Sequence, residues 1–212
     1  QPRLLSIEGG EGAGKSTVLR VLRQALEADG FEVVSTREPG GTPLAERIRG
    51  LLLDPSHEPA APETELLLMF AARAQHVREV VLPALQRGAW VISDRFTDSS
   101  YAYQGAARGL DAAFIAELER RVVGIEPGLT LLLDLGVAHG RERTRGRDLL
   151  GGTGPDRIER ERDEFFERVR TGFLRRAAEH PQRIRVLDAS PSAKQVASAA
   201  LVALAAYRKD LP

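Results

Sequence analysis

The sequence contains no cysteine. Disulfide bonds, thiolate zinc sites and a cysteine nucleophile are therefore excluded. A membrane span requires roughly 20 apolar residues. The longest apolar runs of this sequence, such as residues 66–72, are far shorter. The first residues lack the charged and then apolar pattern of a signal peptide. These absences lead us to expect a cytoplasmic protein with no membrane partner.

Net charge is also absent, because 30 Lys and Arg residues balance 30 Asp and Glu residues. This balance argues against nonspecific binding to a nucleic-acid backbone or to an anionic membrane. Lysine is scarce and occurs only at positions 15, 194 and 209, so a lysine inside a motif is informative. With 212 residues, of which 42% are hydrophobic, we expect one domain spanning residues 1–212.

Short apolar runs alternate with longer helical patterns, which is typical of βαβ units and a parallel sheet. The expected strands are 4–8, 31–36, 90–94, 130–135 and 183–187. Helices are expected to begin near positions 15, 44, 63, 112, 159 and 192, and Pro83 should bend or end the third of these. Gly and Pro cluster at 38–43 and 141–155, which predicts two loops. The second is expected to be a lid or binding loop, with a flexible linker as the alternative.

Residues 9–16 read GGEGAGKS and match the phosphate-binding pattern GxxxxGKS/T, between an apolar strand and a helical pattern. The glycines let backbone N–H groups converge on phosphate oxygens at a helix N-terminus. Lys15 is expected to reach the β- and γ-phosphates, and the Ser16 hydroxyl to hold Mg²⁺. The motif predicts an α/β fold of the P-loop NTPase type, a three-layer sandwich with a five-stranded parallel sheet flanked by helices. The expected ATP contacts of the loop are Gly9, Gly10, Glu11, Gly12, Ala13, Gly14, Lys15, Ser16 and Thr17.

A P-loop does not by itself distinguish GTPases, motor ATPases and small-molecule kinases. Guanine-specific switches usually read the base with an NKxD loop, and this sequence contains no asparagine. The GTPase interpretation is therefore disfavoured.

Further motifs occur in a characteristic order: TREPGGT at 36–42, SDRF at 93–96, YAYQGAARG at 101–109 and DRIE at 156–159. In this combination they resemble the bacterial thymidylate kinases, over nearly the whole chain. The resemblance implies direct, in-line transfer of the γ-phosphoryl group from MgATP to dTMP. It also implies a homodimer.

Asp94 and Arg95 directly follow an apolar strand, where open α/β sheets bind their ligands. A guanidinium at this place can grip a monophosphate with two hydrogen bonds. By resemblance, Asp94 acts near Mg²⁺ and the acceptor phosphate, and Arg49 is a second phosphate-binding residue, whereas Arg47 faces solvent. The alternative for Asp94 and Arg95 is a structural salt bridge at the strand end.

The resemblance also assigns the acceptor site. It implies that Arg73 hydrogen-bonds thymine and that Ser100 and Gln104 contact the ring edge, although Gln104 alone is equally compatible with an exposed loop amide. Tyr103 is expected to disfavour a 2′-hydroxyl. The family usually places Phe four residues before this Arg; here Met69 occupies that position, and we favour Phe70 for stacking on the base. The expected acceptor site comprises Glu11, Glu38, Pro39, Arg49, Met69, Phe70, Arg73, Arg95, Ser99, Ser100, Tyr103 and Gln104.

Phosphoryl transfer also needs cations around the moving group. The segment 141–147, RERTRGR, resembles the basic lid of the bacterial branch, so we place a lid at about 141–157. Arg145 matches the catalytic arginine, with Arg141 and Arg143 nearer ATP. An insertion at 149–155 leaves open which arginine is catalytic, and a solvated loop face is the alternative for the cluster. Glu11 resembles the family carboxylate that contacts the 3′-hydroxyl, and it completes the expected catalytic set with Lys15, Asp94, Arg95 and Arg145.

Two other functions remain possible from the sequence. Another nucleoside-monophosphate or deoxynucleoside kinase would share every phosphate contact and differ only around the base. A non-catalytic P-loop switch would bind nucleotide tightly without turnover stimulated by an acceptor.

Overall fold

A computed structural model of the chain describes residues 1–148 and 156–211. Its five strands are β1 (Leu4–Gly9), β2 (Val33–Arg37), β3 (Trp90–Asp94), β4 (Leu129–Asp134) and β5 (Ile184–Asp188). They form one parallel sheet in the order β2-β3-β1-β4-β5. The predicted strands and the parallel sheet are confirmed, with strand ends within two residues of the expected positions.

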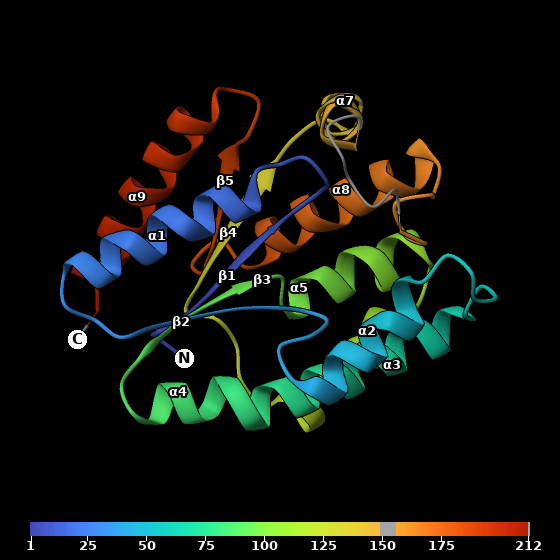
Figure 1. The fold of residues 1–212 in the computed structure, drawn as a ribbon, viewed down its shortest axis with the longest axis horizontal. Coiled ribbons are helices and arrows are strands. Elements are labelled where there is room, and N and C mark those ends of the chain that lie inside the picture. Colours follow the sequence, from blue (N-terminus) through green and yellow to red (C-terminus); the bar gives the residue numbers. More distant parts are fainter. Residues whose placement is uncertain (149–155, 212) are drawn as a thin grey trace.

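Helices connect and cover these strands (Figure 1). The α-helices are α1 (Lys15–Ala28), α2 (Pro43–Leu53), α3 (Pro62–His76), α4 (Leu82–Gln86), α5 (Thr97–Ser100), α6 (Ala112–Leu118), α7 (Val137–Asp148), α8 (Asp163–Glu179) and α9 (Ala193–Lys209). Three π-helical segments are η1 (Val77–Val81), η2 (Tyr101–Ala107) and η3 (Glu119–Val123). No helix in the described ranges is both long and apolar enough to cross a membrane.

The inner strands β1, β3 and β4 are buried on both faces, which makes the fold three layers thick. Leu5 and Ile7 of β1 point into a core shared with α1 and α9, where Leu22 and Leu204 pack. Leu4 points the other way, into a core with Phe70 of α3. On that same side Leu132 of β4 packs against aromatic residues of α8. In Figure 1, α1 and α9 accordingly lie side by side, away from α3 and α8.

Parallel pairing places the carboxyl ends of β1, β2 and β3 along one edge of the sheet. The phosphate loop follows β1, the 38–43 loop follows β2, and Arg95 follows β3. β1 lies between β3 and β4, so the phosphate loop occupies the middle of this edge. The topology therefore brings the predicted motifs together, as open α/β sheets do.

The prediction of a loop over residues 141–155 is wrong for its first half, because residues up to Asp148 belong to α7; residues 149–155 lie outside the described residues. Gly140 serves close packing in this helix rather than flexibility, since a Cβ there would lie 2.6 Å from the Glu11 carbonyl oxygen. The helix expected near Glu159 begins at Asp163, because Asp156 Oδ1 accepts the N–H groups of Ile158 and Glu159 and holds a turn. The third helix runs past Pro83 through η1 and ends at Gln86.

Candidate active site

The phosphate loop joins β1 to the N-terminus of α1. Its backbone has positive φ at Gly9, Gly12 and Gly14, and a Cβ on Gly9 would lie 2.5 Å from the Leu133 carbonyl oxygen, so only glycine fits there. Lys15 Nζ donates to the carbonyl oxygens of Gly9 and Gly10, at 3.2 and 2.9 Å. Burial and the nearby Arg95 lower the Lys15 pKa to about 8.

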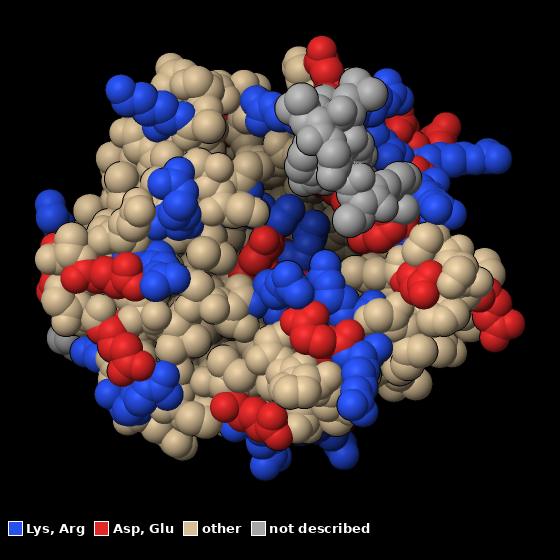
Figure 2. Space-filling model, viewed as in Figure 1, with Lys and Arg blue, Asp and Glu red and all other residues tan. Residues whose placement is uncertain are grey.

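A cleft of about 520 Å³ opens beside this loop. Figure 2 shows basic side chains gathered around the hollow in this face of the molecule. Most of the predicted site residues line the cleft: Glu11, Gly12, Gly14, Lys15, Ser16, Thr17, Glu38, Pro39, Arg49, Met69, Arg73, Asp94, Arg95, Ser99, Ser100, Tyr103, Gln104 and Arg143. Ala13, Phe70 and Arg145 do not, while Gly9, Gly10 and Arg141 line a smaller adjoining cavity. Arg47 is exposed, as predicted from its helical spacing to Arg49.

Arg95 directly follows β3 and has a φ of 73°, a left-handed conformation that is unfavourable for a side chain of this size. Its Nη1 donates to Ser99 Oγ at 3.2 Å, and its Nη2 donates to Tyr103 Oη at 3.1 Å. Burial alone would lower the Arg95 pKa, but Tyr103 and Asp94 outweigh it and raise the pKa. Arg95 is therefore a permanent cation held in one orientation.

Asp94 ends β3 opposite the phosphate loop. Its Oδ1 is buried and has no hydrogen-bond partner among the described residues. A buried carboxylate oxygen without a partner is costly unless a ligand completes the site. This atom is therefore available for a cation or for water held by one.

Arg73 of α3 is buried and is held by the loop after β2 and by the two ends of α5. Its Nε donates to Glu38 Oε2 at 2.6 Å, Nη1 to Ser100 Oγ at 3.1 Å, and Nη2 to the Phe96 carbonyl oxygen at 3.2 Å. Burial alone would raise the Glu38 pKa, but Arg73 and His76 lower it, so Glu38 stays ionised. The Arg73 guanidinium is thereby fixed at the wall of the cleft.

The expectation that Phe70 lines this site is wrong. Phe70 is only 2% exposed and packs in the core, with the Arg73 guanidinium 4.7 Å from its ring centroid. Met69 lines the cleft instead. Adjacent helix residues are about 100° apart around the axis, so the rotation of α3 that turns Met69 toward the cleft places Phe70 in the core.

Glu8 lies buried behind the site, where it hydrogen-bonds Ser99, and sequence reasoning missed it. It is fully buried at the end of β1, where Oε1 accepts the Phe96 N–H at 2.7 Å and Oε2 accepts the Ser99 hydroxyl at 2.6 Å. Burial and the nearby Asp98 raise its pKa to about 8. An acidic residue inside the apolar run 4–8 was the available signal, since such a residue needs buried partners.

The basic segment on α7 has three differently placed arginines. Arg143 donates to the carbonyl oxygens of Ala189 and Ser190 at 3.0 and 3.1 Å. Arg141 pairs with Asp163 at 3.0 Å. Arg145 is exposed.

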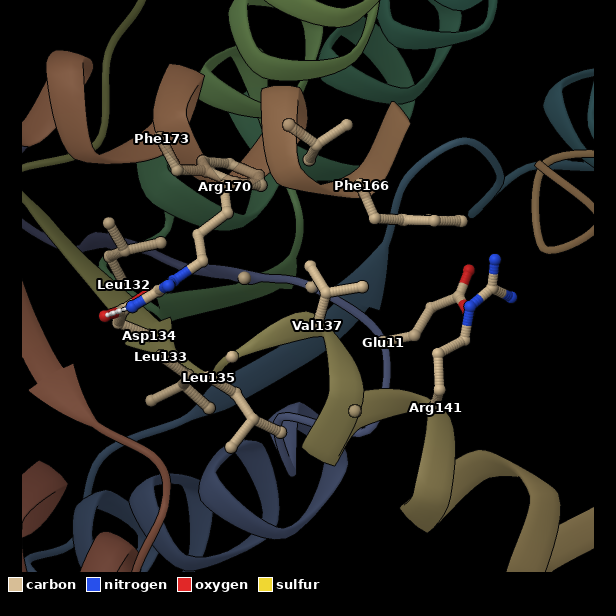
Figure 3. Close-up of a pocket in the computed structure, with 15 residues that line it drawn as sticks. Glu11, Leu132, Leu133, Asp134, Leu135, Val137, Arg141, Phe166, Arg170 and Phe173 are labelled. Carbon is tan, nitrogen blue, oxygen red and sulfur yellow. Dashed lines mark hydrogen bonds and ion pairs between the residues drawn. The ribbon is translucent and has the colours of Figure 1, made fainter. Parts of the chain in front are cut away.

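Glu11 lies between the cleft and the smaller cavity. Figure 3 shows Glu11, Arg141 and Phe166 at one end of that cavity, with the paired Arg170 and Asp134 at the other. Burial and the nearby Glu159 raise the Glu11 pKa to about 7. Its carboxyl group can therefore accept or donate a hydrogen bond near neutral pH.

Comparisons with known proteins agree on one family. The family model for thymidylate kinase matches residues 7–200. The chain is 53% identical over 204 residues to a thymidylate kinase of Alkalilimnicola ehrlichii, covering 96% of this chain and 92% of the relative. It is 57% identical over 187 residues to that of Pseudomonas fluorescens, covering 88% and 87%. A crystal structure of thymidylate kinase from Ehrlichia chaffeensis superposes with a TM-score of 0.76 at 31% identity, covering 95% of this chain and 97% of that one.

Proposed function

This chain belongs to the thymidylate kinase family and phosphorylates dTMP with ATP as the donor; we propose that the γ-phosphoryl group passes directly and in line within the large cleft, giving dTDP and ADP. The observation that carries this proposal is the arrangement of two anion sites around one carboxylate. Main-chain amides and Lys15 form the first, the Arg95 guanidinium forms the second, and Asp94 lies near both.

The donor side is the phosphate loop. Backbone N–H groups of Gly12 and Gly14 and the N-terminus of α1 receive the ATP phosphates, and Lys15 exchanges its two loop carbonyl partners for phosphate oxygens. Arg141 and Arg143 are the proposed ATP contacts from α7. Because the loop backbone is preorganised, only the Lys15 side chain must move on ATP binding, and little reorganisation is needed when charge develops.

The acceptor side is built by the end of β3 and by α2, α3, α5 and η2. Arg95 grips the dTMP phosphate, and Arg49, whose Nη1 donates to the Pro39 carbonyl at 2.9 Å, supplies a second cation. Arg73, Ser100 and Gln104 contact the thymine edge, and Met69 covers the ring through its polarizable thioether. Tyr103 excludes a 2′-hydroxyl, and Glu11 contacts the 3′-hydroxyl.

A magnesium ion fits this site. Mg²⁺ in phosphoryl-transfer sites takes one or two protein oxygens, waters and substrate phosphates, and it neutralises charge on the transferred group. Ser16 and Asp94, whose Oδ1 lacks a partner among the described residues, are the groups that would hold it. Within the described residues there is no cluster of three or more His, Cys, Asp or Glu, so a site made by protein ligands alone is not indicated there.

The remaining assignments are also proposals. Residues 1–212 act as one nucleoside-monophosphate kinase domain in the cytoplasm, with a lid at about 141–157 that carries the catalytic Arg145. The protein forms a homodimer. Exposed Leu44 and Leu51 on α2 and exposed Leu67 on the adjoining α3 support a partner surface there.

A coupled ADP-release assay tests this function across dTMP, dUMP, dGMP, AMP and thymidine. We expect dTMP to give the highest kcat/KM and Arg95→Ala to lower it about a hundredfold. Preference for another acceptor would indicate a different nucleotide kinase. ATP binding without acceptor-stimulated turnover would indicate a switch protein.

A further inference from the structure

A buried carboxylate lies behind the base-binding wall of the cleft. Glu65 of α3 is 1% exposed, and its Oε1 accepts a hydrogen bond from Gln104 Nε2 at 2.9 Å. Its Oε2 accepts from Arg157 Nη2 at 2.6 Å and from Arg108 Nη2 at 3.3 Å. Burial alone would raise the Glu65 pKa, but the hydrogen bonds from Arg157 and Gln104 lower it. Glu65 is therefore ionised at neutral pH.

This charge decides which way the Gln104 amide faces. An ionised carboxylate has no proton to donate, so only the NH₂ group of Gln104 can point toward Glu65. The amide oxygen must then point the other way. Gln104 lines the cleft, and its Oε1 has no hydrogen-bond partner among the described residues. The cleft wall therefore presents a hydrogen-bond acceptor at this place.

We propose that Glu65 is a positioning residue for base selection, which fixes the Gln104 amide so that its oxygen faces the acceptor base. This inference rests on the proposed function, in which Gln104 and Arg73 contact the base edge. Arg73 can only donate and Gln104 presents an acceptor, so the pair matches a pyrimidine with a carbonyl at C4 and a hydrogen on N3. Cytosine has the opposite pattern, with an amino group at C4 and an acceptor at N3. Glu65 therefore directs the site toward thymine or uracil and against cytosine.

The isosteric change Glu65→Gln should reverse this orientation. Arg157 can only donate and contacts Oε2 alone, at 2.6 Å, so it requires the oxygen of the new amide at that position. Arg108 donates to both carboxylate oxygens, at 3.3 and 3.4 Å, and does not decide the orientation. The new NH₂ group then faces Gln104, which must rotate to offer its own oxygen. Its NH₂ group would now point into the cleft, where it opposes the N3 hydrogen of thymine.

The experiment compares kcat/KM for dTMP and dCMP in the wild type and in Glu65→Gln. We expect the ratio of kcat/KM for dTMP to that for dCMP to fall about tenfold, because one hydrogen bond to thymine is replaced by a contact between two donors. The change should lie in KM for dTMP, with KM for ATP nearly unchanged. The melting temperature should fall, because Arg157 and Arg108 lose their carboxylate partner. The matched control is Glu63→Gln on the exposed side of the same helix, which should keep the wild-type ratio.

Glu65 could also have a purely structural role, in which it ties α3 to Arg157. A double-mutant cycle distinguishes this role from one that acts through Gln104. If Glu65 acts through Gln104, adding Glu65→Gln to Gln104→Ala leaves the ratio unchanged. A further fall in that background would overturn the proposal, as would a wild-type ratio in Glu65→Gln alone. Absence of dTMP kinase activity in the wild type would instead count against the proposed function.

A measurement on the wild type covers the case in which Glu65→Gln does not fold. The side-chain NH₂ resonance of Gln104, assigned by its loss in Gln104→Ala, should exchange with solvent slowly both with and without dTMP. Exchange as fast as that of an exposed glutamine would show that no carboxylate holds the amide, and it would overturn the inference.

Discussion

Glu8 shows at the scale of a single residue how burial next to the phosphate loop couples protonation to stability. Its pKa is raised from 4.5 to about 8, chiefly by burial. The folded state therefore keeps a proton that the unfolded state loses as the pH rises above about 4.5. The stabilisation from this group is complete below pH 4.5 and is lost as the pH rises to about 8.

We predict that Glu8→Gln flattens the pH dependence of stability. The variant keeps an acceptor for the Phe96 N–H and has no charge to bury, so its free energy of unfolding should fall less between pH 5 and pH 9 than that of the wild type. Urea unfolding at several pH values measures this. Equal slopes for both proteins would contradict the buried, protonated state of Glu8.

Met69 and Phe70 give a second prediction at residue scale, because neighbouring side chains have opposite roles. Met69→Ala should raise KM for dTMP several-fold, since Met69 lines the cleft, and should lower the melting temperature less than Phe70→Ala does, since Met69 is only partly buried. Phe70→Ala should lower the free energy of unfolding by about 3–5 kcal/mol, because it empties a core position. Steady-state kinetics and thermal unfolding of both variants check this. A large increase in KM for dTMP from Phe70→Ala at unchanged stability would indicate that Phe70, and not Met69, stacks on the base.

The sequence places Met69, Phe70 and Arg73 at neighbouring positions on one side of a helix, but it does not show which of them faces the cleft. Met69, Phe70 and Arg73 are all compatible with one face by spacing, and the packing of Phe70 beneath Arg73 depends on how α3 sits on the sheet. Glu8 was missed for a related reason. Its partners Phe96 and Ser99 lie some 90 residues away in sequence, and no local pattern links them.

At the scale of an element, α7 is the clearest departure from expectation. The Gly and Pro residues clustered over 141–155 predicted a loop, because both weaken helices, yet residues up to Asp148 are helical. The structure places Gly140 against the phosphate loop, where a larger residue would collide with the Glu11 carbonyl oxygen. Glycine here permits close packing between a helix and a loop, and a single sequence does not distinguish this role from flexibility.

We predict that Arg145→Ala lowers kcat about a hundredfold, because removal of one preorganised cation at the transferring group has an effect of this size. KM for ATP should change little. Arg145 is exposed, so the melting temperature should also be unaffected. Pre-steady-state phosphoryl transfer measures the chemical step directly.

Glu142→Ala, at an exposed position of the same helix, is the control and should retain wild-type turnover. A turnover rate of Arg145→Ala within a few-fold of the wild type would exclude Arg145 as the catalytic arginine. Arg143 would then be the next residue to test, since it already lines the cleft.

At the scale of the whole molecule, the order of strands and the place of the cleft followed from simple rules. Alternation of apolar runs and helical patterns predicted the parallel sheet, and the carboxyl ends of its strands carry the phosphate loop, Asp94 and Arg95. The sequence did not predict which apolar side chains would be exposed at the surface. Leu51 and Leu67 each stand in a run of three leucines, 51–53 and 66–68, yet they are 56% and 50% exposed.

These exposed leucines lead to a prediction about assembly. If α2 and α3 form the homodimer contact, Leu67→Glu places a charge in an apolar interface, where its desolvation opposes association. The variant should sediment as a monomer at concentrations at which the wild type is a dimer. Because Leu67 is already half exposed within one chain, the far-UV spectrum should not change. Val202→Glu on α9 is the matched control, since Val202 is 67% exposed and lies on the opposite side of the sheet. A dimeric Leu67→Glu together with a monomeric Val202→Glu would move the interface to α9, since a charge then interferes only on that side of the sheet.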